Sequence, residues 1–549
     1  KFIFCLNCGD FPIGSSSGRD VNLLASLTAE GRSSATTVST LSILEWLASQ
    51  PSSVLKEEHK KLLGFMDNRQ DAALQSGHFN DFIFLALLRG GFLQALQVAG
   101  EAGISPIQLG DAVFHSLALD HEQTVHSWLK NPDVRGQGRM NAVRLMKEML
   151  GYRLMIDQKR GWRYTAPNLE NLNLVRAIYS GLDLIIEDKD FLAHRPSSLR
   201  SLTSEELKQA YVILLDGLRL NLCLSFSVLG TSHLDQLKLQ SLESLCPPWG
   251  FSTTEKPVSS RYFELKQRQS SMQSPKKPKK KTTEETLVSG GFTSYTGVTL
   301  RYARIWNGNR SIFQGNSRDY FEIVQYLLEH ASLHGLVDLI ESDLNLEGNT
   351  VRSIWQIKSD AIRFVQGSKE ESNQFFTGLY ESIQNNLSRK NNTYFSFEAR
   401  EHTAQVDKEI RELREWRFRY DQESKTRLSG INTSTTEINE PRGFLPVLYC
   451  SPTMELGVDI SELNVVYLRN VPPTPANYTQ RGGRAGRGGS AAYITTYASS
   501  KSPHDQYYFH RQDAMVQGTV TVPPIEIANE ELLRAHMHAI WLGAMEVEL

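Results

Sequence analysis

The stretch from residue 444 to residue 497 constrains the fold more than any other part of the chain. Three short apolar runs, at 444–449, 465–468 and 491–496, have the length of buried strands and are separated by polar segments. Strands that alternate with helical segments predict a parallel sheet covered by helices. Ligands bind such sheets beyond the carboxyl ends of the strands, so we expect the polar segments to form a site.

Two motifs occupy the polar segments. The first, at 453–460, reads T-x-E-L-G-x-D-I, and the second, at 480–487, reads Q-x-x-G-R-x-G-R. We expect the two arginines of the second motif to lie on one face at the start of a helix and to reach the same anion. Arginine is always charged and binds oxygens in pairs, which suits a γ-phosphoryl group in transfer. The glycines allow close approach of two backbones.

Together, in this order and each after a strand, the two motifs resemble motifs V and VI of superfamily 2 helicases. The resemblance implies a RecA-like lobe, the second of two motor lobes, with ATP and Mg²⁺ bound mainly by the other lobe. The resemblance implies a catalytic role on ATP for Gln480, Arg484 and Arg487. It places Gly457, Asp459 and Gly483 on the nucleotide-binding side. It implies contact with nucleic acid for Thr453 and Glu455.

Two earlier segments extend the resemblance to a helicase subgroup. A short apolar run at 61–66 is followed by the polar residues Asp67, Asn68 and Arg69, as in the first strand and loop of such a lobe. His402, in E-A-R-E-H-T-A-Q-V, matches a histidine-bearing motif that precedes motif V. We therefore expect Asn68, Arg69 and His402 to contact nucleic acid, although a core or surface role for His402 stays open. The sequence at 450–488 and at 503–507 is most similar to large bacterial helicases of anti-phage defence systems such as DISARM and Druantia. This resemblance implies DNA as the substrate and defence-system partner subunits.

Long helical periodicity separates the two parts of the predicted lobe. The fold class we expect is α/β, a RecA-like parallel-sheet helicase C-terminal lobe interrupted by a large mainly helical insertion. Residues 152–164 are expected to form a β-hairpin with a basic turn around Trp162, in a winged-helix module, and 275–283 a basic linker. The expected divisions are an N-terminal segment (1–55), the first part of the lobe (56–90), the insertion (91–370), the rest of the lobe (371–515) and the start of a C-terminal helical extension (516–549).

Two helicase elements are absent from the sequence. No G-x-x-x-x-G-K-[ST] loop is present to hold ATP phosphates, and no D-E-x-H or D-E-x-D run to hold Mg²⁺. We therefore expect this chain to be inactive alone and a RecA-like lobe to lie upstream of Lys1. The alternative is a non-catalytic nucleic-acid-binding or scaffold subunit, and RNA in place of DNA is a third hypothesis.

Composition adds weaker constraints. The formal net charge of −2 excludes a uniformly basic coat but allows a local basic groove. Cys5 and Cys8, followed by glycine, supply half of a tetrahedral Zn²⁺ site, with structural thiols as the alternative. Few cysteines and no apolar run long enough for a bilayer indicate a cytoplasmic protein without membrane contact. Residues 411–419 are expected to form a solvated charged helix, and 532–541, with two histidines, a helix packed on the lobe rather than a metal site.

Overall fold

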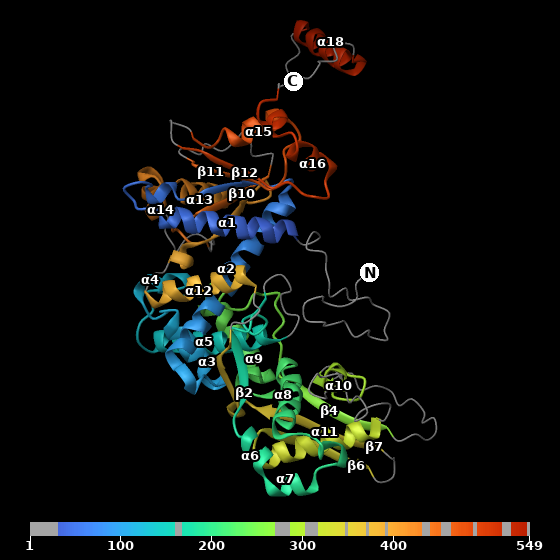
Figure 1. The fold of residues 1–549 in the computed structure, drawn as a ribbon. Coiled ribbons are helices and arrows are strands. Elements are labelled where there is room, and N and C mark those ends of the chain that lie inside the picture. The colour runs from blue at the N-terminus through green and yellow to red at the C-terminus, as the bar shows by residue number, and fades with distance from the viewer. Residues whose placement is uncertain are drawn as a thin grey trace.

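The computed structural model describes residues 31–159, 167–268, 286–301, 317–345, 350–368, 373–389, 393–430, 440–451, 463–486, 491–518 and 529–545. An α/β lobe and a second, larger region are joined through one long helix, α2 (Figure 1). The lobe is formed by segments from both halves of the chain, because the intervening residues build the second region. The RecA-like parallel-sheet fold expected from the sequence, with its interruption, is confirmed.

The lobe is built on a five-stranded sheet in which every pairing is parallel and the order is β12-β11-β1-β10-β9. Its central strand, β1, comes from the early part of the chain, and the other four lie beyond residue 398. Phe65 is opposite both Cys450 and Leu468, so three neighbouring strands end at the same level. The strands are β1 (Leu62–Phe65), β9 (Ala399–His402), β10 (Val447–Cys450), β11 (Val465–Leu468) and β12 (Tyr493–Thr496).

Helices cover both faces of this sheet, because each of its three inner strands is apolar on both sides. One face, with Leu62 and Tyr449, packs under α1 and α2 in the main core. The opposite face, with Phe65 and Leu448, forms a separate core with Phe418 of α13 and Tyr478 of α15. The covering helices are α1 (Gly31–Ser49), α2 (Arg69–Ala99), α13 (Lys408–Arg419), α14 (Gln422–Gly430) and α15 (Pro475–Gly482).

Helix α2 runs from the sheet into the second region. It begins directly after β1, and beyond the sheet it packs against α12 and α3. Gly90 allows this approach, since a Cβ there would overlap the Ile383 side chain of α12. By length and composition, Arg69–Ala102 could cross a membrane although polar and charged residues interrupt its apolar runs, but 78% of its apolar window is buried inside the protein. Core packing accounts for its hydrophobicity.

The second region contains more strand than expected. A five-stranded sheet has the order β3-β7-β4-β5 with β6 also paired to β7, and β2 pairs with β8. The strands are β2 (Val175–Tyr179), β3 (Leu224–Ser225), β4 (Tyr262–Arg268), β5 (Leu287–Ser289), β6 (Val337–Asn345), β7 (Thr350–Lys358) and β8 (Ile362–Gln366). The helices are α3 (Pro106–Ser116), α4 (Glu122–Trp128), α5 (Gly136–Gln158), α6 (Leu182–Glu187), α7 (Lys189–His194), α8 (Ser204–Leu220), α9 (Thr231–Ser244), α10 (Tyr295–Arg301), α11 (Ser317–Leu333) and α12 (Gln374–Ser388).

The predicted hairpin at 152–164 is wrong in its first half. Residues 152–158 are the last two turns of α5, and Tyr152, Leu154 and Met155 are buried. A continuous apolar run fits a buried helix as well as a strand, and packing against α3 and α9 favours the helix. Trp162 and the basic turn lie outside the described residues, and so does the whole of the predicted basic linker at 275–283.

The C-terminal part of the description consists of α16 (Pro503–Phe509), α17 (Gln512–Val516) and α18 (Glu530–Ala544). Helix α18 stands apart from the lobe in Figure 1, and none of its side chains is buried. The predicted helix is therefore present, but it does not pack on the lobe as expected. Its Trp541 is 62% exposed.

Candidate functional site

The carboxyl ends of β1, β10 and β11 bring polar residues from distant parts of the chain to one edge of the sheet. Asp67 lies just beyond β1, Ser451 follows β10, and Arg469 and Asn470 follow β11. The backbone N–H of Arg469 donates to the carbonyl of Phe65 over 3.1 Å, which ties the two loops together. The polar segments after these strands therefore meet at one edge of the sheet, as expected. Two of the residues that meet there, Asp67 and Asn470, are 403 positions apart in the sequence.

An ionic cluster occupies this edge. Asn470 Nδ2 donates to Asp67 Oδ2, and Arg32 Nη1 of α1 lies 3.5 Å from the same oxygen. Arg469 Nη1 lies 2.8 Å from Asp71 Oδ2. Partial burial raises the pKa of Asp67, while Arg32 and Arg469 act in the opposite direction. Two arginines already neutralise both carboxylates, so this cluster is a poor ligand set for Mg²⁺.

Asn68 and Arg69, two of the predicted nucleic-acid contacts, lie at the start of α2. The Asn68 side chain caps the helix by accepting a hydrogen bond from the backbone N–H of Asp71 over 2.9 Å. Asn68 and Arg69 are both exposed. Their position at the edge is compatible with a phosphate backbone, and the contact itself stays a prediction.

The second motif is arranged differently from the expectation. Thr474 caps α15 by accepting from the N–H of Asn477 over 3.2 Å, and the helix ends at Gly482. Gly486 has φ of +75°, and its N–H donates to the carbonyl of Leu463 over 2.8 Å. Arg484 therefore lies in a glycine-terminated turn after the helix, not at a helix start. A positive φ is readily adopted only by glycine, so the turn requires glycine at position 486.

Exposure separates the polar residues of this motif. Gln480 and Gly483 are exposed and Arg484 is half-buried. Burial raises the pKa of the Cys450 thiol well above its usual range, and the nearby charge of Arg484 lowers it. Arg484 thus lies near the end of β10, where the segment with the first motif begins. Arg481, which was not predicted, is buried, with its guanidinium carbon 5.8 Å from the centre of the Phe65 ring. Nothing in its sequence position distinguishes it from the motif's other arginines.

His402, the last residue of β9, is fully buried. Its Nε2 lies 2.7 Å from Glu415 Oε1 of α13, while its Nδ1 has no hydrogen-bond partner. The predicted contact with nucleic acid stays a prediction, and in this conformation the ring offers no exposed atom. The pairing instead ties the end of β9 to α13.

Helix α13 is not the solvated face that its charges suggested. Arg414 and Arg417 are buried, at 7% and 1% exposure. Arg417 Nη2 lies 2.5 Å from Glu398 Oε2, and Arg414 pairs with Glu440. Two carboxylates of opposite charge permit this burial. Glu398 lies just before β9 and Glu440 lies in the segment before β10, so both come from outside α13.

Several predicted residues lie outside the described part of the chain. They are Cys5, Cys8, Thr453, Glu455, Gly457, Asp459 and Arg487. Among the described residues, no group of three or more histidine, cysteine or acidic side chains is placed to hold a metal ion.

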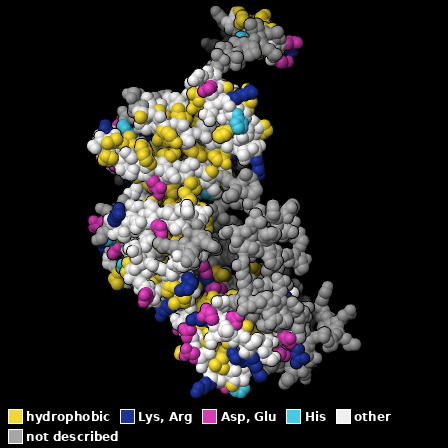
Figure 2. All heavy atoms as spheres, viewed as in Figure 1, with side chains coloured by type: hydrophobic (Ala, Val, Ile, Leu, Met, Phe, Trp, Pro, Cys, Tyr) yellow, Lys and Arg dark blue, Asp and Glu magenta, His cyan; other side chains and the backbone are white. Residues whose placement is uncertain are grey.

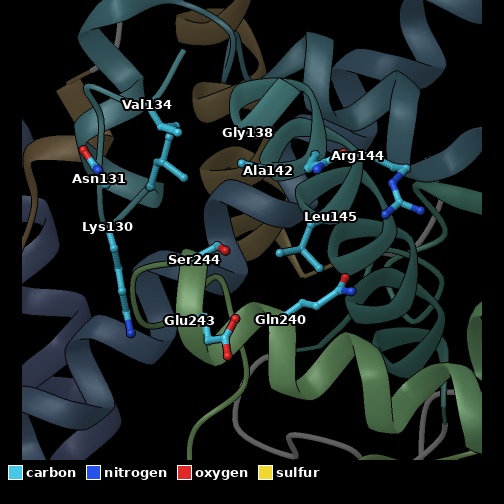
Figure 3. A pocket seen from close by; sticks show the side chains of 12 residues that line it. Lys130, Asn131, Val134, Gly138, Ala142, Arg144, Leu145, Gln240, Glu243 and Ser244 are labelled. Carbon is cyan, nitrogen blue, oxygen red and sulfur yellow. The ribbon is translucent and has the colours of Figure 1, made fainter. Parts of the chain in front are cut away.

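A separate cavity of about 400 Å³ lies in the second region, between the α4–α5 connection and α9 (Figure 3). Its lining is mixed, with Leu145 beside polar groups. Lys130 Nζ donates to the carbonyl of Leu242 over 2.5 Å, and Arg144 lies 3.7 Å from Glu148. Both cations of the lining have partners, so the cavity does not present a strong anion site.

Comparison with known proteins identifies the sheet lobe. Residues 372–489 match the helicase conserved C-terminal domain family. The chain is 34% identical over 192 residues to the Druantia protein DruE of Escherichia coli, and 33% identical over 75 residues to the ATP-dependent helicase HRQ1 of Saccharomyces cerevisiae. The alignments cover 35% and 14% of this chain, but only 10% and 7% of those relatives.

The lobe therefore matches the conserved C-terminal domain of helicases, in agreement with the resemblance to superfamily 2 helicases that its motifs show. The resemblance to the Druantia group that the sequence suggested is confirmed by the first alignment. The lobe carries two residue types that suit a nucleotide, an exposed glutamine, Gln480, and a partly exposed arginine, Arg484. Its described acidic residues at the sheet edge are paired with arginine, so the family's Mg²⁺ needs ligands from elsewhere.

Proposed function

We propose that this chain supplies the second motor lobe of an ATP-dependent superfamily 2 helicase or translocase that acts on DNA. The observation that carries the proposal is the match of residues 372–489 to the helicase C-terminal domain, in which the second motif places Arg484 in a partly exposed turn after α15. Arg481 in the same motif is buried, whereas Arg484 is partly exposed. The name of the relative HRQ1, an ATP-dependent helicase, supports the same activity.

In this proposal, ATP bound on an upstream lobe faces Gln480, Arg484 and Arg487. Hydrolysis of the γ-phosphate, assisted by Mg²⁺ on the other lobe, supplies the energy for movement. Arg484 and Arg487 stabilise charge on the transferring group, since an arginine fork matches phosphoryl oxygens. Gly457, Asp459 and Gly483 belong to the nucleotide-binding side. Movement of the turn then reaches β10 and the motif that follows it, where Thr453 and Glu455 contact the strand.

Further proposals concern the biological role. The likeness to a Druantia protein supports a role in bacterial anti-phage defence. A role in DNA repair, partner subunits and a cytoplasmic location are proposals from the sequence alone. Zn²⁺ on Cys5 and Cys8 remains a proposal that metal analysis of a Cys5→Ser variant tests directly.

The test is ATP turnover by the intact protein with Arg484→Ala and Arg487→Ala. Removing an arginine that stabilises phosphoryl transfer lowers turnover about 10³-fold or more, while DNA affinity is largely retained. Arg427→Ala on α14 is the matched control, because its side chain is 51% exposed, pairs with Glu423 of the same helix and lies 5.6 Å from the centre of the Trp416 ring of α13. Absence of turnover in the unaltered intact protein would instead support the non-catalytic scaffold, and stronger stimulation by RNA than by a matched DNA strand would change the substrate.

A further inference from the structure

Helix α1 lies on the surface of the lobe but presents almost no charge to solvent. Residues 32–49 contain only two acidic or basic side chains, Arg32 and Glu45. Arg32 Nη1 lies 3.5 Å from Asp67 Oδ2, and Glu45 accepts a hydrogen bond from the Tyr394 hydroxyl over 2.5 Å. Both charges are therefore engaged within the chain. Surface helices of soluble proteins ordinarily carry charged residues on their outward side, so α1 is unusual.

The burial of its residues shows which side of α1 faces outward. The buried residues occupy one side of the helix, against the sheet; they are Thr36, Thr37, Thr40, Leu41, Leu44 and Leu47. The outward side is formed by residues spaced three or four apart, which share one face of a helix; they are Ala35, Val38, Ser42, Trp46 and Ser49. None of the outward residues is buried or charged, and Trp46 is 62% exposed.

The first half of α2 continues the same surface. Leu74 is 70% exposed, and a Cβ at Gly77 would meet no atom within 4 Å. His78 Nδ1, one turn after Leu74, lies 2.8 Å from Thr37 Oγ1, so this side of α2 borders α1. Residues 72–80 contain no acidic residue, lysine or arginine. Figure 2 shows the side of the lobe that α1 crosses in Figure 1, with yellow and white atoms over its middle and charged side chains toward its margins.

Together these residues form an uncharged face, made of Ala35, Val38, Ser42, Trp46 and Ser49 of α1 with Leu74 and Gly77 of α2. The centres of protein interfaces are depleted in charged residues and enriched in tryptophan. A nucleic-acid strand needs cations for its phosphates, and helices that lie on membranes carry lysine and arginine beside their apolar side. The uncharged face offers no cation for either, so it suits a protein partner whose contact surface is also uncharged.

A second copy of this chain offers such a contact surface. Homo-oligomers most often form by two-fold symmetry, in which the same patch on each copy packs against itself. Because the face is uncharged, packing it against itself creates no like-charge repulsion. With Ser42 at the two-fold axis and the helices antiparallel, Trp46 of one copy lies opposite Val38 of the partner subunit. The small side chain at the axis permits a close approach of the two helices.

The size of the uncharged face is adequate for a stable dimer. Helix α1 has 19 residues and is therefore about 28 Å long, and two helices side by side are about 20 Å wide. The footprint is about 560 Å² in projection, and its accessible area is larger because side chains project from it. It is thus comparable with the roughly 800 Å² that each partner buries in a stable complex.

We propose that the uncharged face joins two copies of this chain, with Trp46 of each copy as the anchor. The contact leaves the site free, because α15 packs on the opposite face of the sheet and Asn68 and Arg69 lie at its edge. The inference goes beyond the proposed function and does not depend on it, since the contact requires no nucleotide and no DNA.

The experiment measures the mass of the intact protein by sedimentation equilibrium at nanomolar to micromolar concentrations. Trp46→Ala should raise the dimer Kd about 30-fold or more, the effect of losing an interface anchor, of which each dimer loses two. Ser42→Arg should give a monomer, since it places two like charges at the axis, whereas Ser42→Ala should remain dimeric. Leu239→Ala is the matched control, because Leu239 is 65% exposed on α9 of the second region. Unchanged circular dichroism shows that the variants fold.

A crosslink identifies the occupant of the uncharged face directly. With Ser42→Cys, a short bismaleimide should join position 42 of one copy to position 42 of the other, as mapped by mass spectrometry, whereas Leu239→Cys should form no such link. The proposal is overturned by a monomeric unaltered protein, by an unchanged Kd in Trp46→Ala, or by crosslinks from position 42 that reach only other proteins or other segments of the same copy. A crosslink to a different protein would assign the uncharged face to that partner.

Discussion

The buried ion pair between Arg89 and Asp157 joins the helicase lobe to the second region, and its removal has a calculable effect. Arg89 lies on α2, two-thirds of the way from the sheet, and Asp157 on α5. The contact is bidentate, at 2.8 and 2.7 Å, and the side chains are 1% and 2% exposed. Arg89 also donates to the hydroxyl of Tyr380 on α12 and to the carbonyl of Pro167. A single side chain therefore connects three helices.

Arg89→Ala leaves the Asp157 carboxylate buried without its partner. Removing one member of a buried ion pair costs about 3–5 kcal/mol, and each hydrogen-bond partner that is left unsatisfied adds roughly 1 kcal/mol. Tyr380 still donates to the Pro167 carbonyl over 3.1 Å, so only part of that addition applies. We expect the free energy of unfolding at this junction to fall by about 4–5 kcal/mol, or about 10³-fold in its opening equilibrium.

Hydrogen exchange followed by mass spectrometry is the appropriate assay, because a chain with several cores does not unfold in one step. Amides in the second half of α2, in α5 and in α12 should lose about three orders of magnitude of protection. Arg318→Ala is the control, since its pair with Glu322 spans 3.1 Å but the side chains are 74% and 57% exposed, and its effect should stay below about 0.5 kcal/mol. The double change Arg89→Met with Asp157→Leu should recover most of the protection. A loss below tenfold in Arg89→Ala, or an equal loss in the control, refutes this account.

Two further predictions concern thiols and acid stability. Burial raises the pKa of Cys223 to about 12 and that of Cys450 well above the usual range. Neither thiol should therefore react with Ellman's reagent at pH 8 until urea unfolds the protein. Rapid reaction of either thiol in the native state would contradict their burial. Arg417 and Arg400 hold the pKa of Glu398 below its ordinary value of 4.5 despite burial, so its contribution is present above about pH 4.5 and is lost as pH falls through the folded value. Glu398→Gln should flatten the acid side of the stability profile, and an unchanged profile in urea titrations would falsify this assignment.

The sequence by itself determined the local units of the lobe. The apolar runs at β1, β10 and β11 predict strands because four consecutive apolar residues suit a strand that is buried on both sides of a sheet, whereas β12 (Tyr493–Thr496) is a partly exposed edge strand. The polar residues after them, from Asp67 to Asn470, then lie at one edge, since parallel strands all end there. The Q-x-x-G-R-x-G-R motif, which lies within the residues that match the helicase C-terminal domain, predicted roles for Gln480 and Arg484, and these roles stay predictions.

Only the tertiary structure decided which charged side chains are buried and whether an ambiguous apolar run forms a helix or a strand. The burial of Arg417 and the partial exposure of Arg484 depend on which side chains pack against them from other segments, and sequence alone does not distinguish the two arginines. A helix in place of the hairpin at Tyr152 follows from packing on α3 and α9, because an apolar run is compatible with either form. His402 became buried because Glu415, thirteen residues later, folds back over the end of β9. These outcomes are set by long-range contacts, whose free energies exceed the weak local preferences of the chain.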